Sequence, residues 1–288
     1  MSLRIIYFLS LILSSVSAQA DDQPALLSFC QQSVKKLPGL DALVNFSDLC
    51  KLAQKKHSCT SEKGQPIFYF EKLNQNPSAK KILVISLVHG DEPASGAVAF
   101  TWANRLLNLK DSRNSWRIIP ILNPDGWDKN TRMNANGVDL NRNFQTSDWD
   151  YSAKGYWEKN EKKDPRRFPG TTAASEKETK CATEHLSEFE PDMVIAIHTP
   201  YGLLDFDGPQ LKFPKFPGLP WKQLGHFPGS IGRFMWYDRK VPVLTIELES
   251  ADILASTQKV FDLQDLTGLV TIKSLEFLQQ SSFEDYKK

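Results

Sequence analysis

One short apolar segment ends in two side chains that can bind a metal ion, and it restricts the fold more than any other part of the chain. Residues 81–88 read Lys-Ile-Leu-Val-Ile-Ser-Leu-Val, and His89-Gly90-Asp91-Glu92 follows directly. An apolar run of this length predicts a strand that is buried on both faces, as in a parallel sheet covered by helices. The segment therefore predicts an α/β fold in which His89 and Glu92 lie beyond the carboxyl end of a central strand.

Other segments agree with this fold class. Four of them have the apolar character and length of strands: residues 67–70, 116–122, 193–197 and 241–248. Two have the length and composition of helices: residues 93–107 and 173–188. We expect a loop over the polar and aromatic residues 145–172, and a turn at Asn123-Pro124-Asp125-Gly126. Apolar strands alternating with helices predict a mixed, mostly parallel central sheet flanked by helices.

The first 20 residues have the layout of a secretory signal peptide. Arg4 precedes the apolar residues 5–13, and Ala18-Gln19-Ala20 offers a cleavage site before Asp21. An uncleaved membrane anchor is the alternative, but the apolar run falls short of the ~20 residues that span a bilayer. We therefore predict export to the periplasm or secretion, with no stable membrane insertion after cleavage.

The rest of the 288-residue chain divides near residue 62. Residues 21–62 are polar, carry apolar residues at helical intervals and predict a short helical N-terminal extension. Residues 63–288 then form one main domain. The chain has four cysteines, Cys30, Cys50, Cys59 and Cys181, and in an oxidising compartment an even number favours one or two disulfides over inert thiols. Their pairing is left open by the sequence.

The overall charge restricts the class of partner. The formal net charge is +1, whereas a protein that binds nucleic acid normally carries a strongly basic surface. We therefore predict no nucleic-acid partner.

Two more polar side chains stand at or inside apolar strands. His198 closes the segment 193–197, and Glu247 lies within 241–248. Catalytic zinc takes three protein ligands from histidines and carboxylates, so His198 can complete a site with His89 and Glu92. Each histidine alone could equally be an ordinary loop residue, and the set is what favours a metal site.

Burial of Glu247 in an apolar strand raises the pKa of its carboxyl toward the range useful for a general base. A solvated edge residue or a structural ion pair is the alternative. Glu249, two positions further on, would face the same side of the strand, so periodicity alone does not choose between the two glutamates. A separate polar run, residues 137–144 (Gly-Val-Asp-Leu-Asn-Arg-Asn-Phe), can bind an anion.

Five motifs in this order resemble the zinc carboxypeptidases of the M14 type. They are His-x-x-Glu after a strand, Asn-Pro-Asp-Gly, the polar run 137–144, a strand-terminal His, and Thr-x-Glu-Leu, and the likeness covers roughly residues 64–250. Residues 132–137 and 228–232 resemble the bacterial branch of murein peptide amidases and γ-D-glutamyl-diaminopimelate carboxypeptidases. The resemblance implies one Zn²⁺ per chain, held by His89, Glu92 and His198, with Glu247 as the catalytic base.

The resemblance also implies roles for four further residues. Arg132 would stabilise the oxyanion, and Asp139 would orient His89. Asn141 and Arg142 would bind the terminal carboxylate of a peptide or muropeptide substrate. Digestive members of the family carry a mobile tyrosine, for which Tyr201 and Tyr237 are the candidates here.

The implied reaction is hydrolysis of a C-terminal amide bond by a metal-activated water. The branch and the export signal favour the γ-D-Glu–meso-diaminopimelate bond of peptidoglycan stem peptides as the substrate. Asp205 or Asp207 would then meet the extra ammonium group of diaminopimelate, and Arg233 its extra carboxylate. The alternatives are a carboxypeptidase acting on ordinary peptides, a zinc-dependent deacylase or desuccinylase of a small amino acid, and a non-catalytic binding module.

Overall fold

A computed structural model describes residues 23–40 and 46–280. The signal peptide predicted over residues 1–20 lies outside these residues. Within them, no helix combines the length and the apolar character needed to cross a bilayer.

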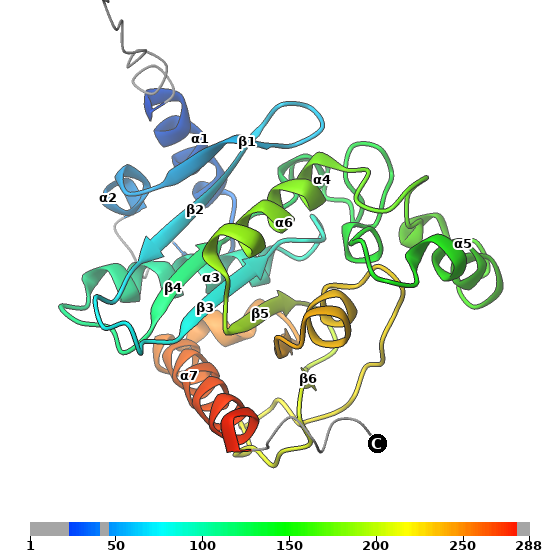
Figure 1. Cartoon of the computed structure of the whole chain (residues 1–288). Coiled ribbons are helices and arrows are strands. Elements are labelled where there is room, and N and C mark those ends of the chain that lie inside the picture. Colours follow the sequence, from blue (N-terminus) through cyan, green and yellow to red (C-terminus); the bar gives the residue numbers. More distant parts are fainter. Residues whose placement is uncertain (1–22, 41–45, 281–288) are drawn as a thin grey trace, which may run out of the picture.

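A seven-stranded sheet forms the centre of the described part of the chain (Figure 1). Its order is β1-β2-β4-β3-β5-β7-β6. The strands are β1 (Gln54–Thr60), β2 (Pro66–Lys72), β3 (Lys81–Ser86), β4 (Ser115–Ile119), β5 (Met193–His198), β6 (Leu203–Asp207) and β7 (Val243–Glu247). The four central strands β4, β3, β5 and β7 are parallel, whereas β1, β2 and β6 pair antiparallel at the two edges. The predicted mixed sheet with a parallel centre is confirmed.

Helices cover both faces of this sheet (Figure 1). The described helices are α1 (Gln23–Lys35), α2 (Phe46–Lys51), α3 (Pro93–Asn108), α4 (Pro124–Lys129), α5 (Trp149–Lys159), α6 (Lys177–Phe189) and α7 (Thr257–Gln280). Short helical turns lie at η1 (Leu140–Arg142), η2 (Pro165–Arg167), η3 (Arg233–Tyr237) and η4 (Ala251–Ala255). In β3, Ile82 and Val84 pack on the side of α3 and α7, and Leu83 and Ile85 pack on the side of α6. Burial on both faces explains why this strand is apolar throughout.

The predicted helical extension is confirmed for α1 and α2 and is wrong for Gln54–Thr60, which forms β1. That strand is polar because it lies at the edge of the sheet, where most of its side chains remain accessible. It pairs with β2, across the proposed domain boundary at residue 62. The division of the chain into domains there stays a prediction.

Two predicted loops contain helices. Residues 145–172 include α5 and η2, and α5 is hard to recognise because only Trp149 and Ala153 of it are buried. The predicted turn at residue 123 starts α4 instead, since the Asn123 side chain accepts a hydrogen bond from the Gly126 amide at 2.9 Å and caps the helix.

One disulfide lies within the N-terminal extension, and a second joins the extension to the main domain. Cys30 pairs with Cys50 between α1 and α2, and Cys59 of β1 pairs with Cys181 of α6.

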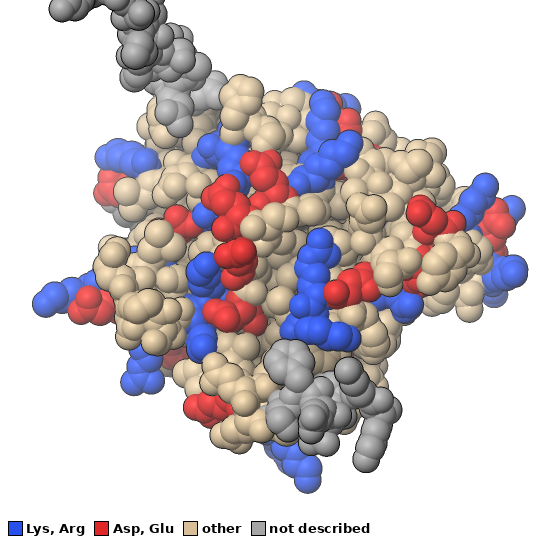
Figure 2. Space-filling model, viewed as in Figure 1, with Lys and Arg blue, Asp and Glu red and all other residues tan. Residues whose placement is uncertain are grey.

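On the face shown in Figure 2, acidic and basic side chains are interspersed and form no continuous basic patch.

Candidate metal and catalytic centre

The turn after β3 places His89 and Glu92. Leu87 adopts a left-handed conformation (φ 43°) that bends the chain out of the strand. Its carbonyl accepts a hydrogen bond from the Asn123 amide at 2.9 Å, and Pro93 then begins α3. A Cβ atom on Gly90 would lie 2.0 Å from the carbonyl carbon of Gly126, so only glycine fits between the turn and α4.

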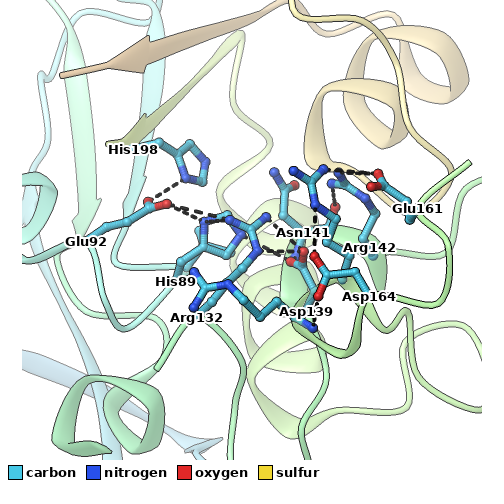
Figure 3. A network of polar contacts seen from close by, with 12 residues as sticks. His89, Glu92, Arg132, Asp139, Asn141, Arg142, Glu161, Asp164 and His198 are labelled. Atoms are coloured by element: carbon cyan, nitrogen blue, oxygen red, sulfur yellow. Dashed lines mark hydrogen bonds and ion pairs between the residues drawn. The ribbon is translucent and has the colours of Figure 1, made fainter. Parts of the chain in front are cut away.

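Three candidate metal ligands meet at the carboxyl ends of β3 and β5 (Figure 3). His89 Nδ1 lies 2.7 Å from Glu92 Oε1, and His198 Nδ1 lies 2.9 Å from Glu92 Oε2. All three side chains are buried. Burial alone would raise the pKa of the Glu92 carboxyl, but the two imidazoles outweigh it and lower that pKa. Glu92 is therefore held as a carboxylate between two ring nitrogens.

This donor set fits zinc. Two imidazole nitrogens and one carboxylate are a ligand set of catalytic zinc sites, which leave a further position open. One ligand atom from each residue lies within 4.8 Å of the others. The other ring nitrogen of His89, Nε2, lies 3.1 Å from Asp139 Oδ1, the outer-shell contact that fixes the orientation of a ligating histidine.

Arg132 lies beside the same cluster. Its Nη2 donates to Asp139 Oδ2 at 2.8 Å, and its Nη1 lies 3.2 Å from His89 Nδ1. Asp139 is fully buried and caps η1 by accepting a hydrogen bond from the Asn141 amide at 3.0 Å. One carboxylate thus positions the candidate ligand and the candidate oxyanion-binding cation together.

Asn141 and Arg142 follow on η1. The Asn141 side-chain oxygen accepts from the Ile231 amide at 2.9 Å, and the Arg142 guanidinium stacks on the Phe227 ring with 4.3 Å to its centroid. Glu161 Oε1 lies 3.7 Å from Arg142 Nη2 (Figure 3). The same oxygen accepts a hydrogen bond from Arg167 Nη1 at 3.1 Å. These contacts hold a buried cation in one orientation.

Glu247 ends β7, in register with His198 on β5. Burial raises the pKa of its carboxyl, and the nearby Glu92 carboxylate adds to that rise. The Tyr201 amide lies within weak hydrogen-bonding distance of Glu247 Oε2, at 3.5 Å. This geometry suits a proton acceptor beside the metal site.

A cavity of about 580 Å³ connects these groups. Its lining contains all of the predicted ligands, base and clamp residues: His89, Glu92, Arg132, Asn141, Arg142, His198 and Glu247. Asp139 lies behind this lining, in contact with His89 and Arg132. The structure therefore brings eight residues from distant parts of the sequence to one site.

A zinc carboxypeptidase family model matches residues 42–204. The chain belongs to the zinc carboxypeptidase family. It is 30% identical over 154 residues to murein peptide amidase A of Escherichia coli K12, a match that covers 52% of this chain and 61% of that protein. It is also 30% identical over 203 residues to murein peptide amidase A of Vibrio campbellii, covering 66% of this chain and 78% of the relative.

A solved structure of the same fold is murein-tripeptide amidase of Escherichia coli O157. The TM-score is 0.53 at 23% identity, and the superposition covers 74% of this chain and 90% of the other. The fold predicted from the five motifs is confirmed.

The residues predicted to contact diaminopimelate lie in different places. Asp205 and Asp207 line the cavity of this carboxypeptidase-family chain. Arg233 does not belong to the lining: its Nε and Nη2 donate to Asp148, at 3.0 Å and 2.8 Å. Its predicted role stays a prediction without a supporting contact.

The two candidate mobile tyrosines also differ. Tyr201 lines the cavity and is 60% exposed, so its ring has room to move. Tyr237 packs edge-on against His226, with 4.4 Å between ring centroids, and is not among the lining residues. Tyr201 is the better placed candidate.

Several cavity residues were not singled out from the sequence. Arg166 of η2 forms an ion pair of 2.7 Å with Asp91, next to the candidate ligand Glu92, and Arg167 forms one of 3.1 Å with Glu161. They come from the segment 145–172, which carries no motif, and only the tertiary structure brings them into the lining of the cavity.

Proposed function

We propose that this chain is a zinc-dependent carboxypeptidase that hydrolyses the amide bond of a C-terminal residue. The observation that carries the proposal is one cavity lined by the three candidate ligands, a buried glutamate and a buried arginine. A non-catalytic binding module would have no use for Glu247 with a raised pKa beside three metal ligands.

His89, Glu92 and His198 would hold the zinc ion. When bound, zinc lowers the pKa of water and polarises a carbonyl oxygen. Glu247 takes the proton of the attacking water on its carboxylate and passes it to the leaving amine nitrogen. A raised pKa suits Glu247 to both proton transfers. It makes the carboxylate a stronger base toward water, and the carboxyl group can still give the proton to the leaving amine.

Arg132 and Asp139 act on charge that develops during the reaction. The Arg132 guanidinium, 3.2 Å from His89 Nδ1, lies where it can donate to the oxyanion formed from the scissile carbonyl. Asp139 holds that guanidinium and His89 in place through both of its oxygens.

Arg142 and Asn141 bind the terminal carboxylate of the substrate. Arg142 is buried and stacked on Phe227, so its fork of donors keeps one direction. A carboxylate held there sets the distance from the chain end to the water activated by Glu247, which restricts cleavage to the last amide bond.

The substrate class we propose is the peptidoglycan stem peptide, cut between γ-D-Glu and meso-diaminopimelate. Two relatives named murein peptide amidase A support it. The secretory layout of residues 1–20 also supports it, because export brings the enzyme to peptidoglycan. Asp205 and Asp207, the two residues proposed to meet the extra ammonium group of diaminopimelate, line the cavity.

Incubation of the purified protein with L-Ala-γ-D-Glu-meso-diaminopimelate tests this substrate. We expect the release of free diaminopimelate, which chromatography measures. Release of C-terminal residues from ordinary peptides alone would reject the murein substrate and keep the carboxypeptidase. Release of an acyl group from N-succinyl amino acids alone would favour a deacylase.

A Glu247→Gln variant tests the base. We expect bound zinc, measured by atomic emission, to be unchanged and kcat to fall by about 100- to 10,000-fold, the usual contribution of a positioned general base. Glu249→Gln is the matched control, because it makes the same change at an exposed glutamate two positions further along the chain. Full activity of the Glu247→Gln variant would reject Glu247 as the base.

A further inference from the structure

The tight turn between β1 and β2, residues 61–65, lies against two elements that support the candidate site. Its backbone closes on itself: the Ser61 amide donates to the Gln65 carbonyl at 2.8 Å, and the Gly64 amide donates to the Ser61 carbonyl at 2.9 Å. The Gln65 amide also donates to the Ser61 hydroxyl at 3.0 Å. We call this segment the β1–β2 turn, and its other donors point to neighbouring elements.

Three of these donors meet one buried carboxylate, Asp125 of α4. The Ser61 hydroxyl and the Gln65 side-chain amide donate to Asp125 Oδ1, at 2.8 Å and 3.2 Å. The Lys63 amide donates to Asp125 Oδ2 at 3.0 Å. Because Asp125 is buried, these hydrogen bonds offset the cost of removing its carboxylate from water. They hold α4 against the β1–β2 turn.

α4 in turn holds the first half of the segment that joins Arg132 to Asp139. The Thr131 amide donates to the Gly126 carbonyl at 2.9 Å, and the Asn123 side chain donates to the Arg132 carbonyl at 3.3 Å. A Cβ atom on Gly126 would lie 2.5 Å from the carbonyl oxygen of residue 133, so the two backbones are in close contact. A shift of α4 would therefore move the Arg132 backbone.

The β1–β2 turn also meets a second buried carboxylate, Glu178 of α6, which holds the other half of the same segment. The Glu62 amide donates to Glu178 Oε1, and the Asn134 side chain donates to Glu178 Oε2, both at 3.1 Å. The Asn134 side-chain oxygen accepts from the Asn136 and Val138 amides, both at 3.1 Å. The loop is therefore closed around a side chain that Glu178 holds.

Arg132 and Asp139 stand at the two ends of this segment and bind each other. Arg132 Nη2 and Nε donate to Asp139 Oδ2, at 2.8 Å and 3.0 Å. Arg132 is the candidate oxyanion-binding cation, and an arginine side chain has many rotamers unless its surroundings select one. That selection depends on the spacing between the two ends of the segment. α4 holds one half of it and Asn134 closes the other, and the β1–β2 turn contacts the carboxylates that hold both.

We propose that the β1–β2 turn is a positioning element of the catalytic centre, which orients Arg132 through Asp125 and Glu178. The turn, Asp125 and Glu178 are not among the residues that line the cavity, so they act through Arg132 and not on the substrate. The inference rests on the proposed carboxypeptidase function. It gives the polar edge strand β1 a role in the reaction.

Asp125→Ala tests the link through α4, because it removes both acceptor oxygens. We expect kcat, measured on the peptide that the wild type cleaves best, to fall by about 10- to 100-fold, since a displacement of about 1 Å at a catalytic group can cost about 100-fold. Bound zinc should be unchanged. KM should change little, because Asn141 and Arg142 have contacts of their own with Ile231 and Phe227.

Two further variants test the same link by degree. Asp125→Asn keeps one oxygen that can accept from the turn, so it should retain more activity than Asp125→Ala, and it replaces that variant if the alanine protein does not fold. Glu178→Ala should also lower kcat, because it releases the Asn134 side chain from α6.

A general loss of stability is excluded by a matched control, Glu71→Ala. Glu71 is a partly buried carboxylate that accepts from Arg117 at 2.7 Å, and neither residue lines the cavity. Its removal should lower the Tm without lowering kcat. In an Arg132→Ala background, Asp125→Ala should reduce kcat no further, because the turn acts through this guanidinium.

Unchanged kcat in Asp125→Ala and Asp125→Asn, or an equal further loss in the Arg132→Ala background, would overturn the inference and leave the carboxypeptidase standing. If the wild type cleaves no peptide, the proposed function fails instead, and hydrogen exchange then decides the inference. The amides of residues 131–139 should exchange faster in the Asp125 variant than in Glu71→Ala, and equal rates overturn the inference.

Discussion

Gly90 restricts the position of the turn that carries the candidate ligands His89 and Glu92. The turn holding His89 and Glu92 touches the backbone of Gly126 at the start of α4, leaving no room for a side chain. The close approach places the candidate ligands His89 and Glu92 against α4, which the Asn123 side chain caps. Here the requirement for glycine comes from a neighbouring backbone, because Gly90 itself does not have a positive φ.

We expect Gly90→Ala to lower both stability and zinc affinity. The added methyl group must displace the turn from α4, and overpacking of this kind costs about 1–3 kcal/mol. Denaturant unfolding measures the loss of stability, and competition with a chelating dye measures zinc affinity. Gly268→Ala in α7 is the control: its Cβ would meet nothing within 4 Å, and alanine favours a helix. Equal behaviour of the two variants would contradict the prediction.

Some residues of the candidate site could be predicted from the sequence because few side chains have the chemistry that the site requires. His89, Glu92 and His198 could be proposed as a set because two histidines and a carboxylate near the carboxyl ends of buried strands match the ligands of catalytic zinc. Arg233 shows the limit, since the Asp148 carboxylate that engages it lies 85 positions away in the sequence. Glu161 was missed for the same reason: only folding brings it to Arg142.

At the scale of elements, a disulfide links the edge strand β1 to α6. The strand is polar, pairs with β2 alone, and is joined through Cys59–Cys181 to α6 on one face of the sheet. The sequence predicted disulfides without their pairing, because pairing follows from where β1 and α6 pack.

Removing this disulfide should destabilise the protein more than removing Cys30–Cys50. The sequence separations are 122 and 20 residues, and loop-closure entropy gives a difference of roughly 1–2 kcal/mol in favour of the longer loop. Thermal unfolding of the two double Cys→Ala variants measures it. Hydrogen exchange in the Cys59/Cys181 variant should be fastest in β1. A larger loss in the Cys30/Cys50 variant would show that the entropy of the unfolded chain is not the dominant effect.

At the scale of the whole molecule, the candidate metal site joins segments that are far apart in the chain. His89 and Glu92 follow β3, His198 ends β5, and these strands are neighbours at the centre of the sheet. An ion bound by all three residues stabilises only the folded chain, in which they meet.

We therefore expect zinc to raise the Tm and a chelator to lower it. Free zinc at about 1,000 times its Kd adds about 4 kcal/mol, which corresponds to roughly 10 °C for a chain of this size. Calorimetry with and without zinc measures the shift. His198→Ala should abolish it, whereas His57→Ala, at an exposed position of β1, should keep it. The same Tm with and without zinc would contradict a site formed by these three residues.

The sequence by itself determined the α/β class, the parallel centre of the sheet and the chemical groups of the candidate site. It could do so because burial on both faces leaves a continuous apolar strand, and because ligand chemistry permits few residue types. Only the tertiary structure decided that β1 is a strand, that residues 145–172 contain α5 and η2, and which cysteines pair. It also decided that the β1–β2 turn binds Asp125 and Glu178. These features depend on contacts between distant segments, and the local sequence of a polar segment does not indicate which distant segment it will contact.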